Sequence, residues 1–365
     1  MSFIVNSLRM NNFRSYEKGY IEFDSHITIL HGPNAAGKTN IIEALHLLTT
    51  GESFRNPKKD DLPLWGADKT QIEFVATDGN LRRDVEIIIS KEDKTTLLNG
   101  KKITSKYEML SALPCVIFNP DDLRIVKEAA ARRRQEIDTL GSQLSPNYSK
   151  LISEYKKITT QRNKMLKEGN YKGDIFEAWT NRLIDVGIAL TEKRIALFER
   201  IQPHVEKYYL ELIGDNENEE SLLVRYESAR GNNDVISFQD ALNKREEDEI
   251  IRKQTLVGPH RDDIIFEING KEARSLASQG QQRSIALAWK LAQLSVIKEF
   301  SNNKPLLLLD DVMSELDQKR RNYLAQIVGE AAQTVITTAN IDYFDKNLLK
   351  RAKVVLVPEH IISSE

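Results

Sequence analysis

The stretch HGPNAAGKTNIIEAL, from His31 to Leu45, contains the pattern G-x-x-x-x-G-K-[ST] without a mismatch. An apolar run at 27–30 precedes the pattern, and the segment 40–48 that follows it repeats apolar residues at helical spacing. This strand–loop–helix context is the one in which such a loop holds phosphate groups. Glycines let backbone N–H groups face the phosphates, and the start of the helix adds a partial positive charge. The stretch therefore predicts an α/β fold that binds a nucleotide.

Each position in the loop has an expected role. Lys38 should reach the β- and γ-phosphates of ATP, and the hydroxyl of Thr39 should bind Mg²⁺. The alternative is a purely structural glycine turn between a strand and a helix. The full pattern in its strand–loop–helix context argues against that interpretation. The residues predicted to bind the nucleotide here are Gly32, Pro33, Asn34, Ala35, Ala36, Gly37, Lys38, Thr39 and Asn40.

A pair of carboxylates completes the expected ATPase site from far along the chain. Four leucines at 306–309 predict a buried strand, and Asp310 and Asp311 follow directly. A carboxylate at the end of such a strand meets the Mg²⁺ shell, and a second one can polarise the attacking water. We assign Asp310 to Mg²⁺ and Asp311 to the general base. The alternative is a strand that ends in a capped turn.

A third segment, SLASQGQQRS at 275–284, precedes the amphipathic run SIALAWKLAQLSVI. Ser278 and Gln281 form S-x-x-Q, which by itself predicts a capping box at a helix start. A helix start with a serine, Gly280 and exposed amides is also a second phosphate site. Two chains that face each other could place this site of one chain on the ATP of the other. ATP would then hold a dimer together.

Composition sets the remaining bounds. The chain has 365 residues, of which 40% are hydrophobic and 29% charged, and this predicts a globular protein of about two domains. Its net charge of −2 confines any nucleic-acid surface to a local patch. The single cysteine, Cys115, lies in an apolar run and predicts a buried thiol. No secretory or membrane-spanning run is present, which favours a cytoplasmic location.

The order of the predicted elements divides the chain into three parts. Short strands are expected near both ends, and Asn99-Gly100 and Asn269-Gly270 each predict a hairpin turn. The middle is charge-rich and mostly helical in pattern, without sustained heptads. We predict an α/β P-loop head split in sequence, with its first half at 1–121 and its second at 251–365, and a helical arm inserted at 122–250.

Together these motifs resemble the signature set of ABC-type ATPase head domains, the group that includes SMC and Rad50 proteins. The resemblance implies that Ser278 contacts the γ-phosphate of the partner chain, with Gly280 and Gln281 beside it. It also implies that Ser314-Glu315-Leu316-Asp317 links the two sites and that Arg14 contacts nucleotide phosphates. Thr337 and Thr338 fall where transporters place a switch histidine, and no histidine is there.

Within that group the chain is most similar to the RecF family of bacterial recombination proteins. One departure is Gln135-Glu136, which stands where an aromatic residue is expected, so the contacts of that helix are open. The resemblance implies an ATP-dependent DNA-binding protein that dimerises on ATP, hydrolyses it slowly and acts at gaps between single- and double-stranded DNA. RecO and RecR would be its partners in loading RecA. The matching segments, in order, are GESFR (51–55), VIFNPDDL (116–123), ARRR (131–134), QRN (161–163), VGPHRDD (257–263), SQGQQRS (278–284) and LLLDDVMSELD (307–317).

Some alternatives stay open at the level of sequence. Arg132, Arg133 and Arg134 could neutralise DNA phosphates or form a solvated helix face. His260 and Arg261 could support the active site or a dimer interface, or lie in a simple turn. The basic residues Lys156, Lys157, Arg162, Lys164 and Lys167 share a predicted helix with few aromatics, which argues against reading of bases.

Other ATPase classes fit less well. A transport ATPase predicts a switch histidine and a short insertion, and neither is in the sequence. A nuclease-coupled ATPase needs an acidic metal cluster after the last strand, and the sequence has none there. An ATPase subunit of a different DNA- or nuclease-associated SMC-like complex is the remaining alternative.

Overall fold

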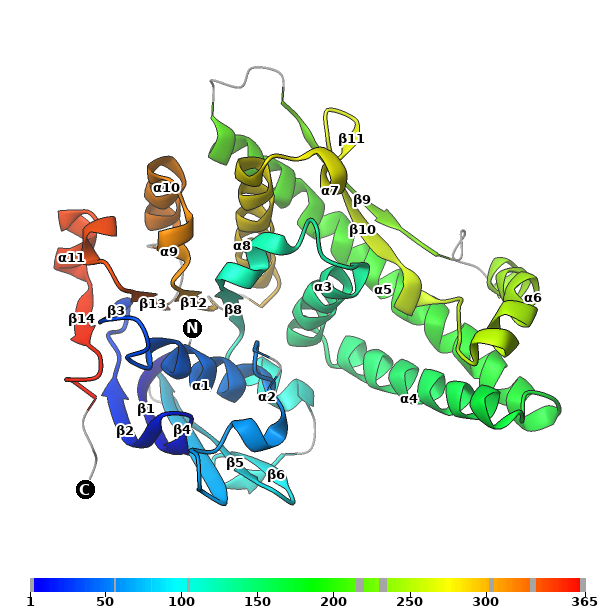
Figure 1. Ribbon diagram of the computed structural model, residues 1–365, viewed down its shortest axis with the longest axis horizontal. Helices are drawn as coiled ribbons and strands as arrows, with labels where there is room; N and C mark the ends of the chain where they lie inside the picture. The colour runs from blue at the N-terminus through cyan, green and yellow to red at the C-terminus, as the bar shows by residue number, and fades with distance from the viewer. Residues whose placement is uncertain are drawn as a thin grey trace. The chain divides into compact units, whose positions relative to one another are not determined.

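The computed structural model describes residues 3–55, 57–79, 81–103, 106–214, 220–229, 235–301, 305–328 and 333–361 (Figure 1). Contacts group the chain into two compact units, one of residues 1–123 with 293–365 and the other of residues 124–292. The predicted arm was 122–250, whereas residues 251–292 pack within the second unit, because strand β10 pairs there with strand β9.

The first unit contains a five-stranded parallel sheet in the order β14-β3-β13-β12-β8. All residues of β12 and β13 are buried, which explains why their sequences are near-continuous apolar runs. The expected strands near both ends of the chain are therefore confirmed, and Cys115 is buried, as predicted. The strands are β3 (Ile27–His31), β8 (Cys115–Phe118), β12 (Leu306–Asp310), β13 (Gln333–Thr338) and β14 (Lys353–Leu356).

A six-stranded antiparallel sheet forms the other layer of this unit, in the order β2-β1-β4-β5-β6-β7. Helix α1 (Lys38–Thr50) contacts strands of both sheets and fills the space between them (Figure 1). The predicted hairpin at Asn99-Gly100 is confirmed, since both residues have positive φ between β6 and β7. The strands are β1 (Ile4–Phe13), β2 (Tyr16–Glu22), β4 (Lys69–Asp78), β5 (Leu81–Ser90), β6 (Lys94–Leu98) and β7 (Lys101–Lys102).

One buried side chain links the two sheets. Gln333, at the start of β13, accepts a hydrogen bond from the Val5 amide at 2.8 Å and donates to the Val5 carbonyl at 2.7 Å. It also donates to the Asp24 carbonyl at 2.8 Å. The side-chain amide of Gln333 thus supplies partners for backbone groups of Val5 and Asp24. The remaining elements of the first unit are η1 (Lys59–Asp61), α2 (Lys106–Ala112), α9 (Val312–Glu315), α10 (Gln318–Val328), η4 (Ile341–Tyr343) and α11 (Lys346–Arg351), while η2 (Pro120–Arg124) reaches its boundary.

The second unit is mostly helical, as the charge-rich middle of the sequence predicted. A three-stranded antiparallel sheet, β11-β10-β9, accompanies the helices, and Asn269-Gly270 forms the predicted hairpin turn between β10 and β11. Its elements are α3 (Ala130–Leu144), α4 (Pro146–Glu168), α5 (Asp174–Ile213), β9 (Leu222–Glu227), α6 (Val235–Arg252), η3 (Pro259–Arg261), β10 (Asp263–Ile268), β11 (Lys271–Glu272) and α7 (Ala273–Leu276), and α8 (Gln279–Ser301) begins in it.

Two of the arginines considered for DNA contact are instead buried in ion pairs. Arg133 is 2% exposed and holds Asp263 at 2.8 and 2.9 Å. Arg162 is 3% exposed and pairs with the buried Glu249 at 2.7 Å. Because these two side chains are buried, they neither contact phosphates nor form a solvated helix face. A strand and a helix distant in sequence supply the carboxylates, so the local pattern could not show the pairing.

The contacts left open around Gln135-Glu136 and His260 are now defined. Glu136 accepts from Lys290 at 2.7 Å, and Arg132 lies 3.3 Å from the same carboxylate. His260 lies in the turn η3, where its Nδ1 is 2.7 Å from the Tyr155 hydroxyl and its Nε2 is 2.9 Å from the Thr255 carbonyl. The histidine is therefore held within its own unit by two hydrogen bonds.

Candidate nucleotide site

The loop between β3 and α1 requires glycine at two points, one because of its backbone conformation and one because another backbone atom lies too close for a side chain. Gly37 has φ +95°, and a Cβ there would lie 2.6 Å from the hydroxyl of Tyr16. A Cβ on Gly32 would lie 2.2 Å from the Val357 carbonyl oxygen. Ala35 also has positive φ, at 66°. The loop is thus a tight backbone cradle at the start of a helix, as expected for phosphate binding.

Lys38, the first residue of α1, folds back over this loop. Its Nζ donates to the carbonyls of Gly32 and Pro33, each at 2.8 Å, and the residue is 7% exposed. Burial lowers the pKa of Lys38, while the charges of Asp311 and Asp310 act in the opposite direction. The ammonium group is therefore already placed at the loop, among carbonyl groups that a phosphate could replace.

The carboxylate pair at the end of β12 meets the loop, although 271 positions separate Asp310 from Thr39. Thr39 Oγ1 donates to Asp310 Oδ1 at 2.9 Å, and Thr337 Oγ1 donates to the same oxygen at 2.8 Å. Burial raises the pKa of Asp310, and these two hydrogen bonds oppose the rise. Hydroxyl and carboxylate oxygens are the ligands Mg²⁺ takes in proteins, so this pair fits the ion assigned from sequence.

Asp311 adopts a left-handed backbone conformation, with φ +53°. Its amide donates to Thr337 Oγ1 at 2.8 Å. Its Oδ1 is buried and has no hydrogen-bond partner among the described residues. Burial raises the pKa of this carboxyl, and the charge of Lys38 opposes the rise. An unsatisfied buried acceptor is costly, which suits a group that receives a ligand there.

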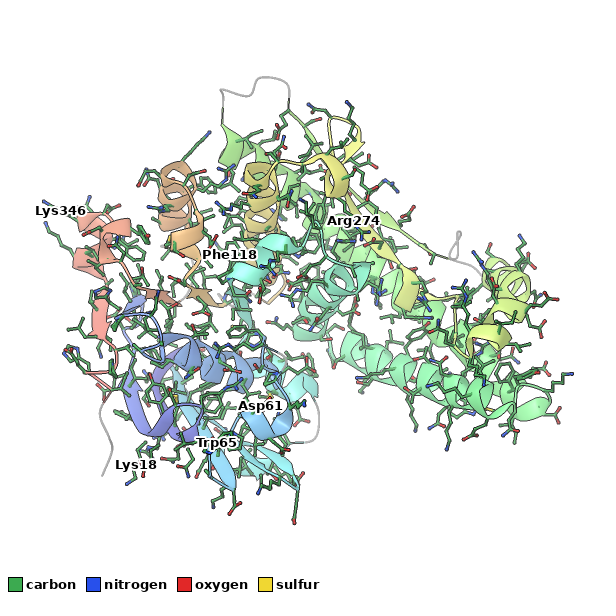
Figure 2. All side chains as sticks on the ribbon, viewed as in Figure 1. Lys18, Asp61, Trp65, Phe118, Arg274 and Lys346 are labelled. Carbon is green, nitrogen blue, oxygen red and sulfur yellow. The ribbon has the colours of Figure 1, made fainter. Side chains whose placement is uncertain are left out.

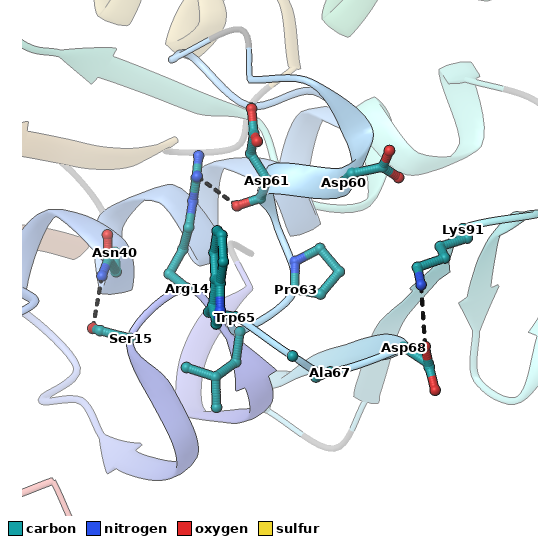
Figure 3. Close-up of a pocket in the computed structure, with 12 residues that line it drawn as sticks. Arg14, Ser15, Asn40, Asp60, Asp61, Pro63, Trp65, Ala67, Asp68 and Lys91 are labelled. Atoms are coloured by element: carbon teal, nitrogen blue, oxygen red, sulfur yellow. Dashed lines mark hydrogen bonds and ion pairs between the residues drawn. The ribbon is translucent and has the colours of Figure 1, made fainter.

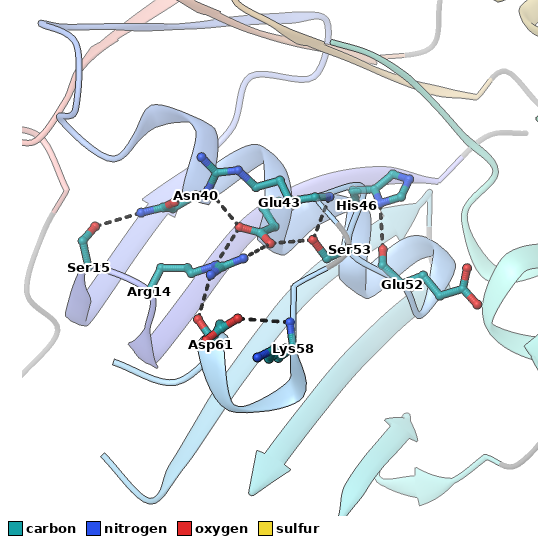
Figure 4. Close-up of polar contacts among 10 residues, drawn as sticks. Arg14, Ser15, Asn40, Glu43, His46, Glu52, Ser53, Lys58 and Asp61 are labelled. Atoms are coloured by element: carbon teal, nitrogen blue, oxygen red, sulfur yellow. Dashed lines mark hydrogen bonds and ion pairs between the residues drawn. The ribbon is translucent and has the colours of Figure 1, made fainter. Parts of the chain in front are cut away.

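A second polar cluster joins α1 to the β1–β2 turn and to the segment that follows α1 (Figure 4). Glu43 has a side chain that is 0% exposed and accepts from Arg14 at 2.6 and 2.9 Å. Ser53 and Arg55 contact the same carboxylate at 2.5 and 3.3 Å. Arg14 was predicted to contact the nucleotide, whereas Glu43 and Arg55 were not. The sequence feature that could have pointed to Glu43 is the presence of a glutamate in the otherwise apolar helix face of NIIEALHLL (40–48).

A pocket of about 730 Å³ opens between this cluster and the segment after η1 (Figure 3). Arg14, Ser15 and Asn40 line one part of it, and Trp65 and Lys91 line another. Ser15 accepts from the Asn40 amide at 2.9 Å, so the pocket reaches the first turn of α1. The side chain of Trp65, labelled in Figure 2, is 99% exposed. A concave site with an aromatic rim and several polar groups is typical of small-ligand binding.

The predicted signature residues belong to the second unit. Ser278 Oγ accepts from the Gln281 amide at 3.2 Å, and Gln281 Oε1 accepts from the Ser278 amide at 2.8 Å. This reciprocal pair is the capping box expected from S-x-x-Q. Gln281 also donates to Glu220 at 2.8 Å, and Gly280 lies in the first turn of α8.

Thr337 and Thr338 are distinguished by the structure. Thr337 contacts both Asp310 and the Asp311 amide, as described above. Thr338 Oγ1 turns away, donating to the Asn340 carbonyl at 2.8 Å and accepting from the Asn340 amide at 3.1 Å. Thr337 is therefore the one of the two that reaches the carboxylate pair.

The parallel sheet, the loop at the start of α1 and the carboxylates at the end of β12 define the head of an ABC/SMC-type ATPase. The chain matches the profile "RecF/RecN/SMC N terminal domain" over residues 4–361. It is 36% identical over 355 residues to DNA replication and repair protein RecF of Agathobacter rectalis, covering 96% of each chain. It is 32% identical over 359 residues to the Bacillus subtilis protein of the same name, covering 95% of this chain and 96% of that one. The chain belongs to the RecF family.

Solved structures agree with this assignment. The recombination mediator protein RecF with ATP, in the RecFOR pathway, superposes with a TM-score of 0.86 at 30% identity, covering 94% of both chains. An Smc head domain from Pyrococcus furiosus superposes with a TM-score of 0.57 at 16% identity, covering 98% of this chain and 95% of that one. The predicted fold class and family are thus confirmed. Among the described residues, no helix is long and apolar enough to cross a membrane.

Proposed function

We propose that this protein binds ATP with Mg²⁺ in the first unit and uses it to control DNA binding in recombinational repair. The observation that carries the proposal is the contact of Thr39 with Asp310 at 2.9 Å, which joins the phosphate loop to the carboxylate pair. A relative of the same family was solved with ATP, which supports the choice of nucleotide. A cytoplasmic location remains a prediction.

Each residue of the proposed ATPase site has its own chemical role. The loop from Gly32 to Asn40 holds the phosphates with its backbone N–H groups, except at Pro33, which has none. Lys38 exchanges its loop carbonyls for phosphate oxygens. Thr39 and Asp310 would hold the metal ion, which would supply positive charge against the phosphates. Asp311 orients the attacking water and accepts its proton, helped by the burial that raises its pKa. Arg14 adds positive charge at the phosphate end of the site.

The pocket beside Asn40 takes the base and ribose of the nucleotide. The indole of Trp65 offers an apolar face for stacking, and neighbouring polar groups offer hydrogen bonds to ribose hydroxyls. Replacing Trp65 by Ala should weaken binding of ATP about threefold to tenfold, the range of one aromatic contact. Binding of inorganic triphosphate, which has no base, should be unchanged. Equal losses of affinity for ATP and for triphosphate would contradict the proposal that this pocket binds the base.

ATP binding drives head-to-head dimerisation. Ser278, with Gly280 and Gln281, completes the site of the partner chain at its γ-phosphate and takes part in catalysis there. The dimer clamps double-stranded DNA next to a single-strand gap, and slow, DNA-stimulated hydrolysis releases it. RecO and RecR assist it in loading RecA. The names of its relatives, DNA replication and repair protein RecF and recombination mediator in the RecFOR pathway, support this assignment.

The Asp311→Asn variant tests the proposal, since it keeps the shape of the site and removes the general base. Its mass is measured by light scattering with and without Mg-ATP and a short gapped duplex, and Lys38→Met is the matched control. We expect a monomer that becomes a dimer with ATP and retains the duplex only then, and a control that stays monomeric. A mass that does not change while ATP is bound would contradict ATP-driven dimerisation.

The same measurement separates the alternative function. An ATPase subunit of a different DNA- or nuclease-associated SMC-like complex would bind ATP but show no preference for the gapped duplex over an intact one of equal length. We expect the gapped duplex to be retained more strongly.

A further inference from the structure

Glu43 is a buried acid that the ATPase chemistry described above does not use. It lies on α1, one turn after Thr39, and its side chain is 0% exposed. Acidic side chains are almost never fully buried without partners, because removing the charge from water costs several kcal/mol. Its burial in the apolar face of a helix therefore needs a reason in its contacts.

Four donors surround this carboxylate and saturate it. Oε1 accepts from Arg14 Nη2 at 2.6 Å and from Ser53 Oγ at 2.5 Å. Oε2 accepts from Arg14 Nε at 2.9 Å and from Arg55 Nη1 at 3.3 Å. The donors come from the β1–β2 turn and from the segment after α1, and they converge on one side chain of α1 (Figure 4). All four groups donate to the carboxylate oxygens of Glu43.

Both arginines extend beyond this carboxylate toward the nucleotide site. Arg55 Nη1 also donates to Asn40 Oδ1 at 3.1 Å, which places the guanidinium at the first turn of α1. The charge of Arg55 acts to lower the pKa of Asp310, so the two groups lie within electrostatic reach of each other. Arg14 lines the pocket beside Asn40. The single carboxylate of Glu43 balances only one of these two guanidinium charges.

We propose that Glu43 is a positioning residue that holds Arg14 and Arg55 as a fixed pair of cations at the polyphosphate of the bound nucleotide. This inference rests on the ATP binding proposed above. Without the carboxylate the two guanidinium groups repel each other and lose their shared anchor. The site must then order two long side chains when the nucleotide binds, which costs affinity.

The test measures binding of a non-hydrolysable ATP analogue in the presence of Mg²⁺ to four proteins. These are the native chain, Glu43→Gln, Arg55→Gln and the double variant. Glu43→Gln should weaken binding roughly tenfold, the size of one charge-assisted hydrogen bond. In the Arg55→Gln background, Glu43→Gln should reduce the affinity for the analogue by a factor several times smaller. The reason is that one of the two cations that Glu43 positions is already absent.

A matched control separates positioning from stability. Glu249 is also a buried glutamate paired with an arginine, Arg162, but it lies in the second unit. Glu249→Gln should lower the urea midpoint of unfolding and leave the affinity for the analogue unchanged. Should Glu43→Gln fail to fold, Ser53→Ala removes one donor to the same carboxylate and should weaken binding a few-fold.

The outcomes are distinct. Loss of affinity in Glu43→Gln that shrinks in the Arg55→Gln background supports the proposal. Unchanged affinity in a folded Glu43→Gln protein, or a loss that is fully additive with Arg55→Gln, overturns it and leaves Glu43 a structural residue. Failure of the native chain to bind the analogue would instead contradict the proposed ATP function itself.

Discussion

The hydroxyl of Thr337 donates a hydrogen bond to Asp310 and accepts one from the amide of Asp311, both at 2.8 Å. One side chain at the end of β13 thus fixes the orientation of the first carboxylate and the backbone of the second. The side chain is 0% exposed, so water cannot replace either hydrogen bond. This relationship gives the first prediction.

Replacing Thr337 by Val keeps the shape and removes the hydroxyl. Asp310 then loses a donor and the Asp311 amide loses its acceptor, so we expect the Mg²⁺ concentration needed for ATP binding to rise roughly tenfold. Thr337→Ser should restore the native value. A Mg²⁺ titration of ATP binding measures this. Thr338→Val is the control, because its hydroxyl bonds only to the Asn340 backbone among the described residues. Equal effects at both positions would contradict a specific role for Thr337.

The loop glycine Gly37 should not tolerate a side chain. Its φ of +95° is strained for other residues, and a Cβ would press on the Tyr16 hydroxyl at 2.6 Å. We expect Gly37→Ala to abolish ATP binding. Gly100→Ala is the control, because Gly100 also has positive φ, +75°, but nothing lies within 4 Å of the added carbon. That variant should lose about 1 kcal/mol of stability and bind ATP normally. Normal binding by Gly37→Ala would show that the loop is more adaptable than its geometry indicates.

The signature serine should affect dimerisation without affecting nucleotide affinity. In Ser278→Arg, a bulky cation would occupy the position of the partner's γ-phosphate in the proposed dimer. We expect this variant to bind ATP like the native chain and to remain a monomer by light scattering. An ATP-dependent dimer of native stability would mean that Ser278 serves only as the cap of α8.

The buried arginine pairs of the second unit should dominate its stability. Arg133→Met leaves Asp263 without its main partner and should lower the free energy of unfolding by about 3 to 5 kcal/mol. Arg182 is the control, because its pair with Glu154 is exposed. Arg182→Met should change the free energy of unfolding by less than about 1 kcal/mol. Urea denaturation followed by circular dichroism compares them. Similar effects for the two variants would contradict the assigned importance of burial.

His260 predicts a pH dependence of stability. Burial lowers its pKa to about 4, against 6.5 in the unfolded chain, and its Nε2 faces a carbonyl that requires a donor. Between these values the unfolded chain binds more protons, so stability falls as pH decreases from 6.5 to about 4, by at most about 1.4 kcal/mol per pH unit. His260→Gln should be less stable at pH 7 and show a shallower slope over this range. Parallel curves of stability against pH for the two proteins would exclude His260 as the source of the pH dependence.

The sequence by itself determined the parts of this protein that depend on neighbouring residues. The phosphate loop, the apolar strands, the two Asn-Gly hairpins and the capping box at Ser278 each follow from a short contiguous pattern. Such patterns act through local backbone geometry, glycine conformation and hydrophobic periodicity, all of which are visible in a single window. The motifs together were also sufficient to indicate the family.

Only the tertiary structure decided which distant residues share a contact. Arg133 meets Asp263 across 130 positions, so an arginine that resembled part of a basic surface instead forms an ion pair inside the second unit. Lys290 likewise meets Glu136 across 154 positions. The contacts of Thr337 with Asp310, and of Glu43 with two arginines, likewise depend on which strand or segment the fold places beside which. The physical reason is that charge and hydroxyl groups carry no periodic signal of their own. Their role is set by burial and by the partners that folding supplies.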